Sequence, residues 1–343
     1  LAGLARLTNG TAEGVTGAVS FSGTTVKLGA DVSLGGMTWT SIGSFAGTFD
    51  GQGHTVSGLA GSALFKLLNS AGTIKNLTVD GAITTDKNYV AALVGTMNAN
   101  TKLLNCVNRA SVTGSDTAAG LVGSANGNAW TPLNPLISGC ANFGTISNGT
   151  NNFSAGIVGT AYYTTLSECY NVGSATGNRV GGILGQTDSN TTVTSCYNAG
   201  AITLAAAGNY NYAGSLIGYN DGGAVSNCYY LTGRQAIGRG SGDTTARTEE
   251  QLKSLDTVLK LGGAFVNDAK NQNSGYPVLA WQDADAKLIV AFSVNMTGAS
   301  VHVYDAQNVE QTPEEDGTYR LVSGSYTYLV TRDECDDVTG SFT

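Results

Sequence analysis

One sequence pattern returns five times between residues 91 and 230, and it constrains the fold more than any other feature. Its first half is a Gly-Leu-Val-Gly-like run, found at residues 92–95, 120–123, 156–159, 182–185 and 215–218. Its second half is an Asn-Cys-Tyr-Asn-like run, found at residues 105–108, 139–142, 168–171, 195–198 and 227–230. Repeats of roughly thirty residues indicate a stacked architecture in which each unit contacts mainly its neighbours.

Each repeat predicts short strands rather than helices. Its apolar runs are brief, are separated by Gly, Asn, Ser and Thr, and lack the 3.6-residue spacing of an amphipathic helix. One such unit cannot bury its apolar side alone, so we expect successive units to stack as a parallel β-helix. A degenerate earlier unit, with Leu64–Leu67 in the first position and Leu77 in place of cysteine, brings the expected stack to about six coils. The insertion from Trp130 to Pro135 predicts a loop.

The glycine that follows each Leu-Val or Ile-Leu pair has two interpretations. It fits a corner that needs a positive φ, or a place where coils approach too closely for a Cβ atom. Composition agrees with a folded repeat protein, because 48 glycines with only 4 prolines exclude collagen-like and proline-rich disordered chains. An apolar content of 41% is enough for a buried core.

Five of the six cysteines share one position of the repeat. Six cysteines in an exported protein would ordinarily suggest disulfides. Equivalent side chains on adjacent coils, however, are parallel and about 4.8 Å apart, a little too far for a disulfide. We therefore expect a file of buried thiols, with Cys335 outside it, and no metal site at this spacing. The asparagines that follow, Asn108, Asn142, Asn171 and Asn198, should stack and join their amides along the pile.

Both ends of the stack need covers for their unpaired strand edges. Leu1–Thr8 has helical spacing and suits one end. Thr248-Glu-Glu-Gln251 is a capping box that predicts a helix with Leu252, Leu255 and Leu259 on one face, closing at Gly262-Gly263 and covering the other end. From residue 287 the apolar period becomes two, with predicted strands at 288–292, 301–304, 319–322 and 326–330. This indicates a small antiparallel β-sandwich of the immunoglobulin-like kind.

Charge marks a boundary between these parts. Residues 1–282 carry 14 acids and 14 bases, whereas residues 283–343 carry 11 acids and 3 bases. We therefore predict a β-helix domain over residues 1–282 and an acidic sandwich over residues 283–343. Without a basic face, nucleic acid and anionic membrane are not expected partners. No apolar run reaches the roughly 20 residues of a membrane helix, and we expect any signal peptide and anchor to lie outside this sequence.

The repeats resemble the GLUG motif of bacterial surface adhesins, which also occurs beside the catalytic part of IgA-specific metallopeptidases. The resemblance covers roughly residues 20–282, and includes an entry segment at residues 39–59 and the Gly275-Tyr-Pro-Val-Leu279 ending. It implies a right-handed parallel β-helix that is secreted or exposed on a bacterial cell surface. It assigns no catalytic residue, because the zinc motif of the peptidase is absent from this sequence.

Two aspartates keep an enzymatic alternative open. Asp188 and Asp221 each follow the second glycine of a repeat by three residues, so they should stack on neighbouring coils. Such a pair would suit a glycoside hydrolase or lyase on a β-helix scaffold, although aspartate is also a favoured turn residue. The two histidines, His54 and His302, lack a nucleophile motif and are expected to be structural.

Aromatic residues near the same turn suggest a binding role instead. The spacing places four aromatic residues on one turn edge of successive coils, where the rings either stack on sugar faces or pack over the turn and shield it: Trp130, Tyr162, Tyr163 and Tyr219. The sequence therefore predicts a surface adhesin-type or spacer module that contacts an extracellular glycan or protein ligand. No catalytic residue, cofactor or metal is predicted for that function.

Overall fold

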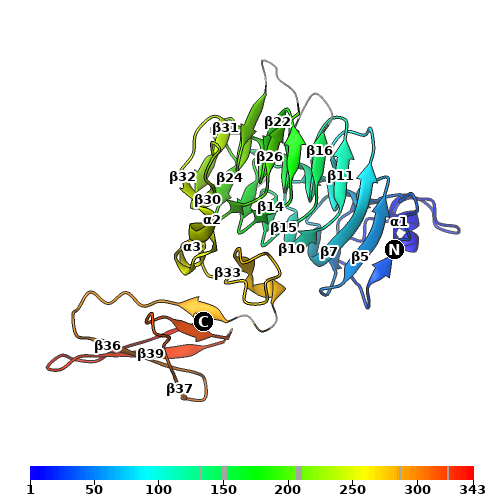
Figure 1. The fold of residues 1–343 in the computed structure, drawn as a ribbon. Coiled ribbons are helices and arrows are strands. Elements are labelled where there is room, and N and C mark those ends of the chain that lie inside the picture. The colour runs from blue at the N-terminus through cyan, green and yellow to red at the C-terminus, as the bar shows by residue number, and fades with distance from the viewer. Residues whose placement is uncertain (131–132, 149–152, 206–210, 284, 286, 323) are drawn as a thin grey trace. The chain divides into compact units, whose positions relative to one another are not determined.

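The computed structural model describes residues 1–130, 133–148, 153–205, 211–283, 285, 287–322 and 324–343. These form two compact units, Leu1–Leu252 and Lys253–Thr343. The first unit is a parallel β-helix, as predicted, in which successive strands stack side by side along the pile (Figure 1). The domain boundary that we placed after residue 282 on the basis of charge remains a prediction about where the acidic sandwich begins.

Three parallel sheets, here called A, B and C, form the walls of the first unit. Among the described residues, each Gly-Leu-Val-Gly half contributes one strand to sheet B. Sheet B contains β3 (Ile42–Phe45), β6 (Phe65–Leu68), β9 (Val94–Asn98), β13 (Val122–Asn126), β18 (Val158–Tyr162), β23 (Leu184–Thr187), β28 (Ile217–Asn220) and β31 (Ile237–Arg239). Sheet C contains the short strands just before them: β8 (Val90–Ala91), β12 (Ala118–Ala119), β17 (Phe153–Ala155), β22 (Arg179–Gly181) and β27 (Tyr212–Gly214).

Sheet A carries the remaining strands of each coil, including the Asn-Cys-Tyr-Asn half. Its members are β1 (Thr25–Lys27), β2 (Val32–Ser33), β4 (Thr48–Asp50), β5 (Thr55–Ala60), β7 (Thr73–Thr84), β10 (Lys102–Asn108), β11 (Ser111–Gly114), β14 (Leu136–Ser138), β15 (Ala141–Asn142), β16 (Ile146–Asn148), β19 (Thr165–Ser167), β20 (Tyr170–Asn171), β21 (Ala175–Gly177), β24 (Thr192–Thr194), β25 (Tyr197–Asn198), β26 (Ile202–Leu204), β29 (Ala224–Ser226), β30 (Cys228–Leu231) and β32 (Thr244–Arg247).

The register of the strands follows the sequence repeat. Phe65 pairs with Val94, and Cys106 pairs with Leu77, so the degenerate coil aligns as expected. Sheet B extends one strand further at each end than the six predicted coils, through β3 and β31. Strand β3 lies in the entry segment at residues 39–59 that the resemblance included, whereas the coil of β31 was not predicted because it lacks a cysteine half. The predicted loop from Trp130 to Pro135 is irregular where it is described, and residues 131–132 lie outside the described residues.

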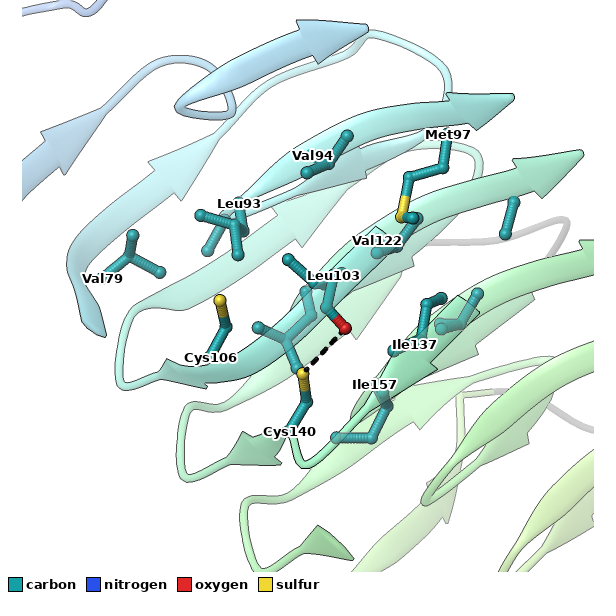
Figure 2. Close-up of a cluster of buried hydrophobic side chains, with 14 of the residues drawn as sticks. Val79, Leu93, Val94, Met97, Leu103, Cys106, Val122, Ile137, Cys140 and Ile157 are labelled. Atoms are coloured by element: carbon teal, nitrogen blue, oxygen red, sulfur yellow. Dashed lines mark hydrogen bonds between the residues drawn. The ribbon is translucent and has the colours of Figure 1, made fainter. Parts of the chain in front are cut away.

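The five repeat cysteines are buried free thiols that line the interior with leucine, isoleucine and valine (Figure 2). In the close-up, Cys106 and Cys140 lie on successive coils beside Leu103, and the Cys140 thiol donates a weak hydrogen bond to the Leu103 carbonyl at 3.8 Å. Cys335 is exposed. The predicted file of thiols is therefore present in the core of the first unit.

The asparagine column is also as predicted. Asn108, Asn142, Asn171 and Asn198 are joined by amide–amide hydrogen bonds of 2.7 Å at each step. Each Nδ2 also donates to the carbonyl two residues later, at 2.8–3.0 Å. All four side chains are buried, so the column satisfies polar groups that would otherwise destabilise the wall.

Helix α1 (Ala2–Thr8) covers the N-terminal edge of sheet B. A Cβ atom on Gly43 of β3 would lie 2.6 Å from the Thr8 carbonyl oxygen, so α1 lies directly against that edge strand. Ala5 is buried in the core, and Leu1 and Leu4 pack against it. Among the described residues, no helix is long and apolar enough to cross a membrane.

The predicted C-terminal helix is present but broken. Its capping box forms, because the Thr248 amide donates to Gln251 Oε1 at 3.0 Å and the Gln251 amide donates to Thr248 Oγ1 at 3.2 Å. Helix α2 (Glu249–Lys253) then stops at the extended residue Ser254, and α3 (Leu255–Leu261) follows. The break resets the helical phase, so the prediction for Leu259 was wrong: it is 37% exposed, while Leu261 is buried.

The second unit contains a short hairpin and the predicted sandwich. The hairpin is β33 (Phe265–Val266) with β34 (Val278–Leu279), followed by the 3-10 turn Ala280–Gln282. The two antiparallel sheets are β35 (Leu288–Val290) with β38 (Tyr319–Leu321), and β36 (Ser300–Tyr304), β37 (Glu310–Gln311), β39 (Tyr326–Thr331) and β40 (Val338–Phe342). Their shared core is formed by Val303, Tyr319, Leu321 and Tyr326, with Phe292 against it.

Candidate functional site

A column of side chains, at or directly before the first residue of each sheet C strand, lies beside the outer surface of sheet B. Its members are Tyr89, Thr117, Phe153, Arg179 and Tyr212, each placed three residues before a Gly-Leu-Val-Gly-like run. The second glycine of the next run makes room for them. A Cβ atom on Gly123 would lie 2.4 Å from the Tyr89 carbonyl oxygen, and one on Gly185 would lie 2.8 Å from Phe153 Cβ.

This contact decides between the two interpretations of the repeat glycine. Gly95, Gly123, Gly159, Gly185 and Gly218 all have ordinary negative φ values, so close approach is the reason for glycine at these positions. Close packing brings the sheet C column against a second column, which projects from sheet B. The second column runs through Thr96, Ser124, Thr160, Gln186, Tyr219 and Arg239 in register.

The two columns converge on a cluster of rings and a guanidinium group in the last coils. The Arg239 guanidinium carbon lies 5.0 Å from the centre of the Tyr219 ring and 5.4 Å from that of Tyr212. Its Nη1 donates a hydrogen bond of 2.9 Å to the Tyr212 hydroxyl, which raises the pKa of Arg239. The two rings are 5.9 Å apart, and the Tyr219 hydroxyl donates to Asp221 Oδ1 at 3.2 Å.

The preceding coils continue the same arrangement. The Arg179 guanidinium carbon lies 5.0 Å from the centre of the Phe153 ring. Gln186 Nε2 donates to the Tyr162 hydroxyl at 3.5 Å. Burial raises the pKa of Tyr162, and the nearby Tyr89 and Asp188 add to that rise. We refer to this surface as the aromatic–arginine face, and it consists of Phe153, Tyr162, Arg179, Gln186, Tyr212, Tyr219, Asp221 and Arg239.

The predicted aromatic edge is only partly assembled. Tyr162 and Tyr219 both belong to the aromatic–arginine face, but they occupy different ladder positions, because Tyr219 pairs with Gln186. The single file of rings that we expected was therefore wrong for Tyr219. The reason is their distance from the repeat glycine: Tyr219 follows Gly218 directly, whereas Tyr162 is the third residue after Gly159.

Tyr163 and Trp130 lie beside this face at the turn. Tyr163 is half-buried with φ 50°, and a Cβ atom on Gly127 would lie 2.7 Å from Tyr163 Cβ. The base of the Trp130 loop therefore packs on Tyr163. Trp130 itself is 93% exposed, the largest exposed fraction among the large apolar side chains that the structure describes.

Asp188 and Asp221 follow the paired residues Thr187 and Asn220, so they lie on adjacent coils in register, as expected. Their carboxylates have different partners. Asp188 Oδ1 accepts from the Tyr163 amide at 3.1 Å, the Asn190 amide at 3.3 Å and the Thr191 hydroxyl at 2.7 Å. These donors make Asp188 part of the turn, whereas Asp221 is exposed and binds Tyr219.

The histidines occupy two separate exposed pairs. His54 Nδ1 lies 3.2 Å from Asp31 Oδ1 in the entry turn, and His302 Nδ1 lies 2.6 Å from Glu310 Oε1 in the sandwich. Over the described ranges, no three His, Cys, Asp or Glu side chains gather as they would around a metal ion.

The face combines chemical groups that suit polyhydroxylated ligands. Aromatic rings offer apolar platforms, guanidinium and amide groups donate hydrogen bonds, and Asp221 accepts them. The sequence analysis missed four residues of this face. Phe153, Arg179 and Tyr212 share a position three residues before a Gly-Leu-Val-Gly-like run, which is a signal in the sequence. Arg239 is recognised only from its pairing with Tyr219. The fold and this face define the protein as a β-helix repeat protein with a chemically mixed outer surface.

Comparison with known proteins supports the fold. No family model matches the chain. In structure, the chain is similar to a Bacteroides ovatus protein provisionally described as an immunoglobulin A1 protease, with a TM-score of 0.61 and 21% identity over 76% of this chain and 86% of that one. In sequence, 88 residues are 36% identical to halomucin from Haloquadratum walsbyi, and they span 24% of this chain and 1% of halomucin.

Proposed function

We propose that the chain is a binding module of an extracellular or cell-surface protein, and that its aromatic–arginine face holds a glycan. The observation that carries the proposal is the contact of Arg239 with two tyrosine rings, Tyr212 and Tyr219, on the outside of the helix. Two neighbouring rings, tilted by 43° to one another, and a guanidinium group held by both provide a prearranged surface for a sugar ring and its hydroxyl groups.

The similar proteins support the extracellular location. Immunoglobulin A and mucins are both found outside cells, and the two similar proteins carry these words in their descriptions. The Gly-Leu-Val-Gly repeats support an adhesin-type or spacer role of the GLUG kind. Trp130 and Tyr163 are proposed as additional contacts at the edge of the face, because Trp130 is exposed on a loop whose base packs on Tyr163.

A glycan array with the whole chain tests this function. We expect retention on at least one class of glycan, with affinity reduced by about tenfold in Tyr219→Ala and in Arg239→Ala, since each change removes part of one platform. Arg234→Ala is the matched control, because Arg234 is also exposed and lies outside the face. Trp130→Ala tests the loop separately.

Two results would contradict the proposal. One is a glycan that the unmodified chain binds on the array and that Tyr219→Ala and Arg239→Ala bind equally well, which would place the ligand elsewhere. The other is release of new reducing ends from a polysaccharide, abolished by Asp188→Asn, which would favour the hydrolase or lyase alternative with Asp188 and Asp221.

A further inference from the structure

A cleft of about 580 Å³ lies at the N-terminal coils, and its chemistry differs from that of the aromatic–arginine face. One side is formed by the segment Thr38–Ser41, and another by the segment Lys87–Tyr89, which directly precedes strand β8 of sheet C. Lys66 of β6 and Thr96 of β9 also line it. The cleft therefore lies over the outer surface of sheet B in the first unit.

Trp39 is held rigidly at the side of the cleft. Its Nε1 donates a hydrogen bond of 3.1 Å to the Leu64 carbonyl, and its ring packs against the core of the first unit. A ring that is fixed before a ligand arrives loses little conformational freedom on binding. Trp39 can thus serve as a preformed platform for an apolar sugar face.

Tyr89 also lines the cleft, and its backbone conformation is unusual. Its φ is 54°, a left-handed conformation that is unfavourable for a large side chain, and the residue is 44% exposed. Backbone strain of this kind persists where the surrounding structure enforces it and is frequent at ligand sites. Here it presents an aromatic ring at the cleft instead of the glycine that the backbone would prefer.

The charge of the cleft is positive, although the chain carries a net charge of −8. Lys66 and Lys87 line it, and no aspartate or glutamate is among its lining residues. Within the part of the chain that the structure describes, neither lysine has a carboxylate within ion-pair distance. Two cationic amines beside rings and hydroxyl groups would bind a carboxylate that is attached to a sugar.

We propose that this cleft binds a carboxylate-bearing sugar, with Lys66 and Lys87 pairing with its carboxylate and Trp39 and Tyr89 contacting its ring. Thr38, Thr40, Ser41 and Asn88 supply hydroxyl and amide groups for the sugar hydroxyls. This site is distinct from the aromatic–arginine face, which lies on later coils. Each can therefore fail without the other.

Calorimetric titration with two acidic probes and their neutral counterparts tests the proposal. The probes are trigalacturonate and sialyllactose, compared with galactotriose and lactose. We expect at least one acidic probe to bind at least tenfold more tightly than its neutral counterpart. Lys66→Gln and Lys87→Gln should each weaken that binding about tenfold, and increasing salt should weaken it further.

Lys102→Gln is the matched control, because Lys102 is an exposed lysine on β10 of sheet A. Tyr89→Gly adds a second readout: it should weaken binding of the acidic probe without lowering the melting temperature, because glycine relieves the left-handed backbone. Equal binding of acidic and neutral probes, or binding that the lysine variants leave intact, would overturn the proposal. So would the absence of binding to both acidic probes, even if the aromatic–arginine face retained its glycan.

Discussion

The asparagine column joins four buried amides, and each inner member depends on neighbours above and below. Asn142 donates to Asn171 and to the Gly144 carbonyl, and it accepts from Asn108 and from the Gly144 amide. Asn198 ends the column, because the residue paired with it on the next coil is Tyr230. The same residue type therefore has one more amide–amide bond inside the column than at its end.

This difference predicts unequal costs of two otherwise identical substitutions. Asn142→Ala should lower the free energy of unfolding by about 3 kcal/mol, because buried polar groups lose their partners. Asn198→Ala should cost about 1 kcal/mol less, since it breaks one amide–amide bond fewer. Urea denaturation of both variants measures this, and equal losses would contradict a cooperative column.

Sequence patterns predicted residue positions where one residue type recurs, and failed where types vary. Cysteine and asparagine return at fixed places, so their stacking in the core and in the wall could be predicted from spacing alone. The sheet C column changes from Tyr89 to Thr117, Phe153, Arg179 and Tyr212, so nothing in its composition marks it. Its role depends on which side of sheet B it faces, which only the register and the glycine contacts determine.

Among the elements, the strands of sheet B depend on the glycine that lets sheet C approach. A Cβ atom on Gly159 would lie 2.3 Å from Thr117 Cγ2 and 2.6 Å from the Gly123 carbonyl oxygen. Gly123 lies in β13 and Thr117 is buried just before β12, so both neighbours have little room to move.

We therefore expect Gly159→Ala to destabilise the first unit by about 2 kcal/mol, through overpacking between sheets B and C. Gly29→Ala is the control, since no atom lies within 4 Å of a Cβ atom there and its φ is not positive. Thermal melting should show a clear loss for the first variant and no loss for the second. A harmless Gly159→Ala would show that the coils can separate at this position.

The thiol file makes a prediction at the same scale. All five repeat cysteines are at most 1% exposed, so a reagent in solution cannot reach their sulfur atoms. Burial also raises the pKa of the Cys106 and Cys169 thiols, which keeps these two protonated. In the native chain, a thiol reagent should therefore label Cys335 and leave the five repeat cysteines unlabelled, and all six should react after denaturation. Fewer than six reactive thiols in denaturant without reductant would instead support the disulfide alternative.

Helical elements were predicted less accurately than strands. The capping box correctly located the start of α2, because it is a local hydrogen-bond pattern. The interruption at Ser254 could not be predicted in the same way, because serine occurs both inside helices and at their N-caps and so does not mark a break. Strands β37 and β40 were missed because their residues lack the alternating apolar pattern that marks the other sandwich strands.

At the scale of the whole first unit, a parallel β-helix is a nearly one-dimensional stack. Each coil pairs with one coil on each side, and β31 ends the order of sheet B. Stability in such stacks depends on each unit and on its contacts with neighbours, so the same loss has different consequences at the centre and at an end. Ile157 lies in a central coil and is fully buried, while Ile237 lies on β31 and is half-buried.

Ile157→Ala should cost about 2–4 kcal/mol and should lower hydrogen-exchange protection on both sides of its coil, because it breaks the stack at the centre. Ile237→Ala should remove protection mainly from β31 and the adjoining β28, because only one neighbour depends on the last coil. Hydrogen–deuterium exchange with mass spectrometry resolves the two patterns by peptide. If Ile237→Ala reduced protection equally from β6 to β31, the unit would unfold as one block, and the nearest-neighbour description would be wrong for this protein.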